Sequence, residues 1–335
     1  MNKNKRDSSI DILRFIGLML IILSHASPSP DYIMQIRCFD VPMMLFISGL
    51  TCANKDFPKY FQFVKKRTAR LITPVYIFLV AYFIFLVIVQ GLGYIPQILT
   101  TRKAIESFLL LDGIGYVWII RVFLLIMLVT PVLCKIGRLR NSIVASIITI
   151  LLLACDAIVY LLDNCAMPDI VHTFIKDYMI YTLAYSAPFL LGYKLRYSNT
   201  RSSIFWAVFC CMLILTGLYV YINSIGYPIA ITPKFKYPPQ SYFMIYGMFC
   251  SVILWLSRNW WIKVLDCKLT RFIGQNTIWI YLWHIPLVAL LLNVVNNWCI
   301  RYAILVCIPT LMFYIQYKIV NGINIPTKIK NYLIG

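Results

Sequence analysis

The stretch DILRFIGLMLIILSHAS, residues 11–27, decides the fold class, because it is long and apolar enough to enter a bilayer as a helix. It nevertheless contains Asp11, Arg14 and His25, three groups that are costly to bury in hydrocarbon. A helix that served only as an anchor would have no use for them. The stretch therefore predicts a transmembrane helix with a role beyond anchoring.

The composition of the whole chain agrees with a membrane protein. Of the 335 residues, 61% are hydrophobic and only 13% are charged, whereas a soluble domain carries about 25% charged residues. The apolar residues form separate runs of about twenty, the length of a transmembrane helix. Apolar and polar residues do not alternate with period two, which argues against an outer-membrane barrel. The expected fold class is all-α, a polytopic transmembrane helix bundle.

We predict about ten spans in a single integral membrane domain, residues 1–335, with no fused soluble domain. The spans are expected at residues 10–27, 36–53, 71–91, 116–135, 142–162, 177–194, 203–223, 240–257, 274–296 and 301–320. The 11 cysteines are mostly scattered through these runs and form no CxxC pair. They are therefore expected to be small buried apolar residues, and no metal site is expected.

The basic residues predict the topology. The formal net charge is +19, but the cations lie between the apolar runs rather than in one patch, so nucleic acid is not an expected partner. With a cytoplasmic N-terminus, 22 basic residues face the cytoplasm and 7 face outside, while Arg14 and Arg121 lie within spans. This excess favours a multi-pass protein of the cytoplasmic (inner) cell membrane with both termini in the cytoplasm.

Helical geometry relates the three polar groups of the first span. Each residue advances by 100°, so Arg14 and His25, eleven positions apart, differ by about 20° and share a face. Asp11, three residues before Arg14, is within ion-pair reach. Arg14 and His25 are about 16 Å apart along the axis, which puts His25 toward the outer half. The alternative to a functional role is a structural one. Asp11 and Arg14 would then form an ion pair at the membrane interface, and the His25 side chain would extend toward the outer surface.

Two further segments carry suggestive residues. DVPMMLFISGL, residues 40–50, contains Ser48 and Gly49 within an apolar run, which allows another helix to approach closely. FVKKRTARLITPVY, residues 63–76, places a basic cluster just before a predicted span. This cluster consists of Lys66, Arg67 and Arg70. It is either the usual group of basic residues at the cytoplasmic end of a span or an anion site suited to phosphates.

Two later segments add buried ionisable groups. GYVWIIRVFLLIMLVTP, residues 115–131, carries Arg121 inside a span. GQNTIWIYLWHIPLV, residues 274–288, carries His284 at mid-span. Ionisable residues within membrane helices usually mark a functional pathway, although packing in the core is the alternative.

Together these segments resemble the acyltransferase-3 family of integral membrane acyltransferases. The resemblance runs in family order from Arg6 to about Pro286, and it begins with an Arg, ten residues and a His, here Arg14 and His25, after Asp11. The other matching positions are Pro42, Ser48 and Gly49; Arg67, Arg70 and Pro74; Trp118 and Pro131; and Tyr281 and His284. One departure is Tyr116, where many members have a histidine.

The resemblance implies an acyl donor, usually acetyl-CoA, and a carbohydrate acceptor that offers a hydroxyl group. The donor phosphates are then expected at Arg14, Lys66, Arg67 and Arg70. His25 is expected to remove the proton of the acceptor hydroxyl, or to take the acyl group itself and pass it on. Asp11 would orient Arg14.

Weaker expectations concern the remaining positions. Arg121, Tyr281 and His284 are candidates for holding the acceptor or stabilising the oxyanion. Asp40 is a candidate for orienting His25 or binding a sugar hydroxyl. Ser48 and Trp118 enter only as motif residues near the substrate. Acceptor choice is expected in the outer loops 92–115, 163–176 and 224–240.

A transporter or flippase of a sugar or glycolipid is the alternative function. It would use the same buried charges, and transporters often show internal repeats with broken helices in matching positions. The two halves of this chain show no clear repeat, which favours the enzyme. Transfer from labelled acyl-CoA distinguishes the two.

Overall fold

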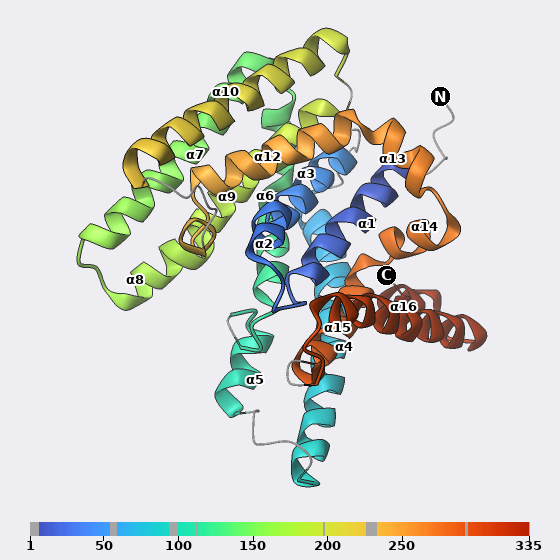
Figure 1. Ribbon diagram of the computed structural model, residues 1–335. Coiled ribbons are helices and arrows are strands. Elements are labelled where there is room, and N and C mark those ends of the chain that lie inside the picture. The colour runs from blue at the N-terminus through green and yellow to red at the C-terminus, as the bar shows by residue number, and fades with distance from the viewer. Residues whose placement is uncertain are drawn as a thin grey trace. The chain divides into compact units, whose positions relative to one another are not determined.

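The computed structural model describes residues 7–53, 59–93, 100–111, 113–196, 198–225, 233–291 and 294–334. In these ranges every regular element is a helix, which confirms the all-α fold class (Figure 1). The helices fall into two compact units, each described by itself. Parts of the predicted outer loops 92–115 and 224–240 lie outside the described residues.

The first unit contains most of the helices. They are α1 (Ser8–Leu23), α2 (Asp31–Arg37), α3 (Asp40–Cys52), α7 (Asn141–Asn164), α8 (Asp169–Phe174), the π-helical η1 (Ile175–Met179), α9 (Ile180–Leu195), α10 (Thr200–Ile225), α11 (Pro233–Lys236), α12 (Ser241–Leu256), α13 (Arg258–Leu265) and α14 (Lys268–Gln275). The second unit contains α4 (Tyr60–Gly91), α5 (Thr101–Phe108), α15 (Thr277–Leu291), α16 (Trp298–Gly322), α17 (Thr327–Ile334) and residues 25–29. The remaining helix, α6 (Trp118–Gly137), is shared between the units along its length.

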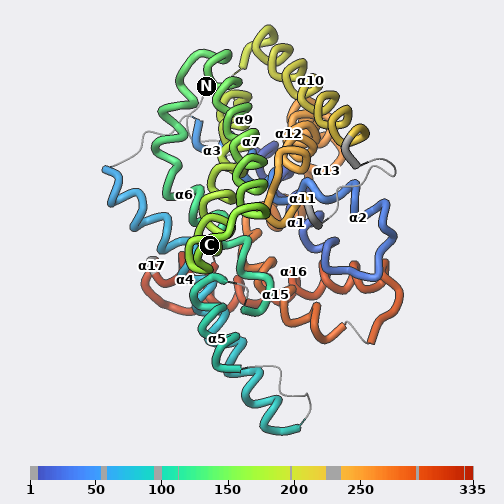
Figure 2. The backbone as a smooth tube through the Cα atoms, turned by 90° about the vertical axis from the view of Figure 1, so that its left-hand side faces the viewer, coloured from blue at the N-terminus to red at the C-terminus, as the bar shows by residue number. Residues whose placement is uncertain are grey.

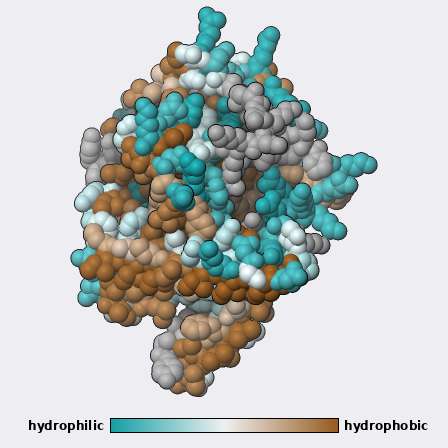
Figure 3. All heavy atoms as spheres, turned by 90° about the vertical axis from the view of Figure 1, so that its right-hand side faces the viewer, coloured by the Kyte–Doolittle hydropathy of each residue, from teal (hydrophilic) through white to brown (hydrophobic). Residues whose placement is uncertain are grey.

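The helices identify a multi-pass membrane protein. Among the described residues, six helical segments are long and apolar enough to cross a membrane, and a seventh is added if α12 and α13, bent by 68°, form one span. Each of the ten predicted spans coincides with a helix, but α1, α9 and α12 have 16 residues and α15 has 15. At 1.5 Å per residue such helices reach only about 24 Å, less than the hydrocarbon thickness. The count of ten and the side of the termini therefore stay predictions. Large areas of the exposed surface are apolar, as a lipid-facing surface requires (Figure 3).

Helices α3 and α9 form the most extensive contact among the described helices of the first unit, and they lie side by side in both ribbon and tube views (Figures 1 and 2). A Cβ atom on Gly49 of α3 would lie 2.0 Å from the carbonyl oxygen of Phe189. A Cβ atom on Gly192 of α9 would lie 2.0 Å from the carbonyl oxygen of Phe46. The close approach predicted at Gly49 is confirmed, because glycines on both helices let the backbones touch.

The first helix is shorter than the sequence predicts. Asp7 caps its N-terminus, since its side chain accepts a hydrogen bond of 2.9 Å from the amide of Ser9. The helix ends at Leu23, where the Ser24 hydroxyl donates to the carbonyl of Ile21. Pro28 and Pro30 follow and have no N–H to continue the ladder. The predicted end at residue 27 is therefore wrong, and His25 lies in a turn.

Helix α4 is longer than the predicted span 71–91. It begins at Tyr60 and continues through Pro74 to Gly91, so that the basic cluster lies within its first turns rather than before it. In the same unit, the indole N–H of Trp283 on α15 donates to Gln316 on α16 at 2.7 Å. The amide group of Gln316 in turn donates to the carbonyl of Leu333, which holds α17 against α16. Polar side chains thus fix the helix that carries His284.

Candidate active site

Two histidines from distant parts of the sequence meet in the second unit. His25 lies in the turn after α1, and His284 lies in the middle of α15. His284 Nε2 is 2.9 Å from His25 Nδ1, and the two rings are stacked with centroids 5.0 Å apart. His284 is completely buried, whereas His25 is half-buried. The pair therefore consists of one buried ring that supports a second, more accessible ring.

The hydrogen bonds assign the ring protons of the neutral pair. The second ring nitrogen of His284, Nδ1, contacts the carbonyl oxygen of Tyr281. A carbonyl oxygen only accepts, so Nδ1 must carry the proton and Nε2 must be the acceptor. His25 then donates from Nδ1, and its Nε2 carries the lone pair. This is the arrangement of an oriented base, in which one nitrogen is held and the other can take a proton.

Two tyrosines border the histidine pair. The ring of Tyr116 meets the His25 ring edge to face at a centroid distance of 5.0 Å. The hydroxyl of Tyr281 donates to the backbone carbonyl of Tyr116 at 2.7 Å. Tyr281 was a predicted site residue, but Tyr116 was not. Tyr116 could have been identified from the sequence, because many members of the resembled family have a histidine at this position.

Arg121 and Trp118 lie at the start of α6, within the second unit. Arg121 is only 4% exposed, and Trp118 is half-buried. Three positions separate them, so both side chains lie on one side of the helix. A buried guanidinium in an apolar helix is costly unless it is compensated. Its predicted role toward the substrate stays a prediction.

Ser48 lies on α3 in the first unit. Its hydroxyl donates to the carbonyl of Met44, four residues earlier, at 3.0 Å. This bond satisfies the hydroxyl within its own helix. The expected place of Ser48 near the substrate stays a prediction.

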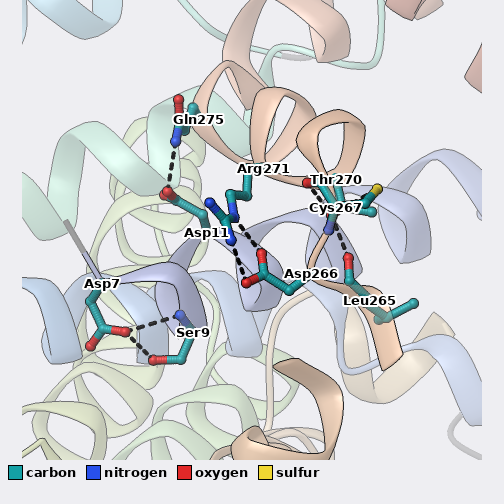
Figure 4. A network of polar contacts seen from close by, with 9 residues as sticks. All are labelled: Asp7, Ser9, Asp11, Leu265, Asp266, Cys267, Thr270, Arg271 and Gln275. Carbon is teal, nitrogen blue, oxygen red and sulfur yellow. Dashed lines mark hydrogen bonds and ion pairs between the residues drawn. The ribbon is translucent and has the colours of Figure 1, made fainter. Parts of the chain in front are cut away.

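Asp11 is the centre of a polar network in the first unit (Figure 4). It is 2% exposed, and its Oδ2 accepts a hydrogen bond of 2.9 Å from Gln275 of α14. The Arg14 guanidinium is 4.0 Å from Asp11 Oδ1, so the two lie at ion-pair distance as expected. A Cβ atom on Gly274 would lie 1.9 Å from the carbonyl oxygen of Asp11, and α14 therefore packs directly on α1. Sequence reasoning missed Gln275.

A second ion pair borders this network. Arg271 binds both carboxylate oxygens of Asp266, with Nη2 2.5 Å from Oδ2 (Figure 4). The hydrogen bond to Asp266 raises the pKa of Arg271, and the negative charge of Asp11 adds to this. The same hydrogen bond lowers the pKa of Asp266. Asp11 thus has two arginines near it, Arg14 and Arg271, and both are on a surface that remains partly exposed.

The basic cluster of α4 lies in the second unit. Lys66 and Arg70 are exposed, whereas Arg67 is half-buried with its guanidinium 5.7 Å from the centroid of the Phe63 ring. The exposed pair, four residues apart, shares one side of the helix. Arg14 belongs to the first unit. A donor site built from all four cations therefore stays a prediction.

Asp40 is already engaged by cations. It lies at the start of α3, 2% exposed, and its Oδ2 is 2.6 Å from Arg37. Its Oδ1 accepts from the amide of Val41 at 2.9 Å and is 3.9 Å from the ammonium of Lys236. The predicted roles of Asp40, orienting His25 or binding a sugar hydroxyl, remain untested by this geometry.

These features define a class of protein: an integral membrane protein of apolar helices that holds a hydrogen-bonded histidine pair. The chain matches the acyltransferase-3 family, described as an acyltransferase domain, over residues 7–317, and it therefore belongs to that family. Neither the comparison with curated proteins nor that with solved structures found a match. Among the described residues, no group of three or more His, Cys, Asp or Glu side chains is arranged to hold a metal ion.

Proposed function

We propose that this membrane acyltransferase moves an acyl group, in the first place acetyl, from cytoplasmic acyl-CoA to a carbohydrate hydroxyl. The acceptor is a cell-surface or lipid-linked carbohydrate, and the protein acts in the inner cell membrane. The observation that carries the proposal is the hydrogen-bonded chain from His25 through His284 to the Tyr281 carbonyl. It provides the oriented base that the attack of a hydroxyl group on a thioester requires.

In the proposed reaction, His25 Nε2 accepts the proton of the acceptor hydroxyl while the hydroxyl oxygen attacks the thioester carbonyl. The carbon–sulfur bond then breaks, and the proton on His25 passes to the leaving thiolate. His284 holds the Nδ1 proton of His25 throughout and stabilises the imidazolium. A base positioned in this way contributes about 10²–10⁴-fold. Direct attack by Nε2 to form an acyl-histidine uses the same tautomer and is the second route.

Several other predicted residues have supporting parts in this proposal. Arg14, Lys66, Arg67 and Arg70 bind donor phosphates, for which cationic side chains are well suited. Arg121 stabilises the oxyanion, and Tyr281, whose hydroxyl proton is donated to the Tyr116 carbonyl, helps to hold the acceptor. The burial of Arg121 near the start of α6 supports its part, since preorganised charge acts most strongly where water is excluded.

The test is acyl transfer by membranes that contain the protein. Such membranes, supplied with ¹⁴C-labelled acetyl-CoA and with host envelope glycans, are expected to place label on carbohydrate, and membranes without the protein are not. The glycans are then analysed for alkali-labile acetyl esters. A protein that moves glycans across the membrane and leaves the label on CoA would contradict the proposal.

Arg14 provides a test of the donor side. Replacing Arg14 by alanine is expected to raise the KM for acetyl-CoA about tenfold with a smaller effect on kcat, because one charged hydrogen bond to a phosphate is lost. Asp11 keeps its bond to Gln275, so the network remains supported. Arg102→Ala is the matched control, since its side chain is 88% exposed and is paired with Glu106 one turn along the same helix. An unchanged KM in Arg14→Ala would contradict the assigned role.

A further inference from the structure

A second cluster of charged side chains lies in the first unit, outside the groups used above. Arg37 ends α2, Asp40 begins α3, and Lys236 ends α11. The Arg37 and Lys236 nitrogens lie 2.6 Å and 3.9 Å from the two oxygens of Asp40. The three side chains are only 7%, 12% and 3% exposed for Arg37, Lys236 and Asp40, respectively. Two largely buried cations therefore share one carboxylate.

The ion pairs of the cluster give two cations one carboxylate. Burying a cation is costly unless an anion or several acceptors replace its water. Arg37 also has the backbone carbonyl of Leu20 at 3.4 Å. Lys236 is 3.9 Å from Asp40, the long end of an ion-pair distance, so a ligand with a negative group would add to its stabilisation.

Two buried donors near Asp40 also lack acceptors. Among the described residues, no hydrogen-bond partner lies within reach of Arg37 Nε or of the Tyr185 hydroxyl, although both are buried. Tyr185 is completely buried on α9 and lies within electrostatic reach of Asp40. Buried donors are almost always satisfied, so each exception calls for an explanation. An oxygen-rich ligand would supply acceptors to both groups.

Aromatic rings surround the second cation. The ammonium of Lys236 is 5.4 Å from the ring centroid of Tyr237 and 6.0 Å from that of Phe243. The neighbouring rings of Tyr221 and Tyr242 are stacked at 4.9 Å. Aromatic faces beside a cation suit a ligand that combines an apolar ring face with a negative group. A sugar with a carboxylate or phosphate has this combination.

We propose that Arg37 and Lys236 bind the anionic group of an acidic carbohydrate. The inference adds a ligand site within the first unit and does not depend on the proposed function. The carboxylate of a sugar acid and the phosphate of a sugar phosphate share the chemistry that the site requires. Asp40 keeps the two cations in place and is a positioning residue.

Binding can be measured without turnover. The purified protein in phosphatidylcholine nanodiscs is titrated by calorimetry with glucuronate, glucose 6-phosphate and glucose. At least one of the two acidic sugars is expected to bind, and glucose is expected to bind at least tenfold more weakly. Equal binding of glucose, or binding of no acidic sugar, would overturn the inference. Binding of phosphatidylglycerol without either acidic sugar would assign the site to a lipid headgroup and overturn the inference of a carbohydrate ligand.

Variants locate the binding. Lys236→Gln is expected to weaken binding of the acidic sugar at least tenfold and Lys236→Arg to preserve it, because the charge is retained. The 2.6 Å pair of Arg37 and Asp40 stays in Lys236→Gln, so the fold keeps its buried ion pair. Lys263→Gln, an exposed cation on α13 in the same unit, is the matched control and is expected to bind as the wild type does. If Lys236→Gln binds the acidic sugar as the wild type does, the sugar does not bind at this cluster and the inference is wrong.

The His25→Ala variant separates this inference from the proposed function. It is expected to bind the acidic sugar with wild-type affinity, because His25 takes no part in the ion pairs that define the cluster. If labelled acetyl reaches carbohydrate but no acidic sugar binds, the inference fails and the function stands. If an acidic sugar binds through Lys236 but no acetyl is transferred, the site stands and the function fails.

Discussion

Replacing His25 by alanine is expected to lower acyl transfer by about 10²–10⁴-fold, the contribution of a positioned general base. The side chain lies in a turn after α1 and is only half-buried, so its removal leaves the helices in place. The KM for acetyl-CoA is expected to stay near the wild-type value, since His25 acts on the acceptor hydroxyl. The measurement is the initial rate of label transfer, normalised to folded protein by gel filtration.

His284 provides the matched comparison for His25. His284→Leu removes the acceptor for the proton on His25 Nδ1, so the His25 ring is no longer held in one orientation. We therefore expect the rate of acyl transfer to fall by about 10–100-fold. His284→Gln offers a carbonyl oxygen in place of Nε2 and is expected to retain more activity than leucine does. Leu290→Ala, at an exposed position of the same helix, is the control and is expected to remain active. Wild-type rates in His25→Ala would exclude both the base and the acyl-histidine route.

Replacing Gly49 by alanine is expected to destabilise the folded protein by about 3 kcal/mol or more, at the upper end for an overpacked core. The new methyl group would meet the Phe189 carbonyl oxygen at 2.0 Å and the Tyr193 amide nitrogen at 2.8 Å. Both atoms belong to the backbone of α9, so no side chain can turn away. Helices α3 and α9 would have to separate along their contact, which is the most extensive in the unit.

Gly217→Ala is the matched control for Gly49. Gly217 lies on α10 in the same unit, and a Cβ atom added there would have a side-chain carbon of Tyr242 as its nearest neighbour, at 3.5 Å. Alanine there meets only ordinary contacts and favours the helix, so stability is expected to be equal or slightly higher. Thermal unfolding in detergent measures both variants. A melting temperature in Gly49→Ala equal to that of Gly217→Ala would contradict the tight helix contact.

Patterns in the sequence were enough to predict the features that depend only on residues close together along the chain. Hydropathy over about twenty residues predicts helices, because a helix satisfies its own backbone in lipid. The three-residue spacing of Asp11 and Arg14 predicts their proximity, since one helical turn brings them together. Gly49 predicts close packing because it lacks a side chain. Its partner Gly192, 143 positions later, is identified only in the folded chain.

The end of the first helix shows where local reasoning was incomplete. The apolar run continues to Ala26, but the Ser24 hydroxyl bonds back to Ile21 and prolines follow. The helical rotation that put Arg14 and His25 on one face therefore does not apply, because the helix ends at Leu23. Turn chemistry, which hydropathy does not measure, decided the position of His25.

By itself, the sequence determined the helical membrane class and the family, and it singled out the two histidines as candidates, since these follow from residue type and spacing. The tertiary structure alone decided that His284 Nε2 faces His25 Nδ1, across 259 positions of sequence. It also decided that Asp40 is shared by Arg37 and Lys236. The physical reason is that hydropathy and periodicity act within one helix, whereas a ring tautomer or a shared charge depends on which helices pack together.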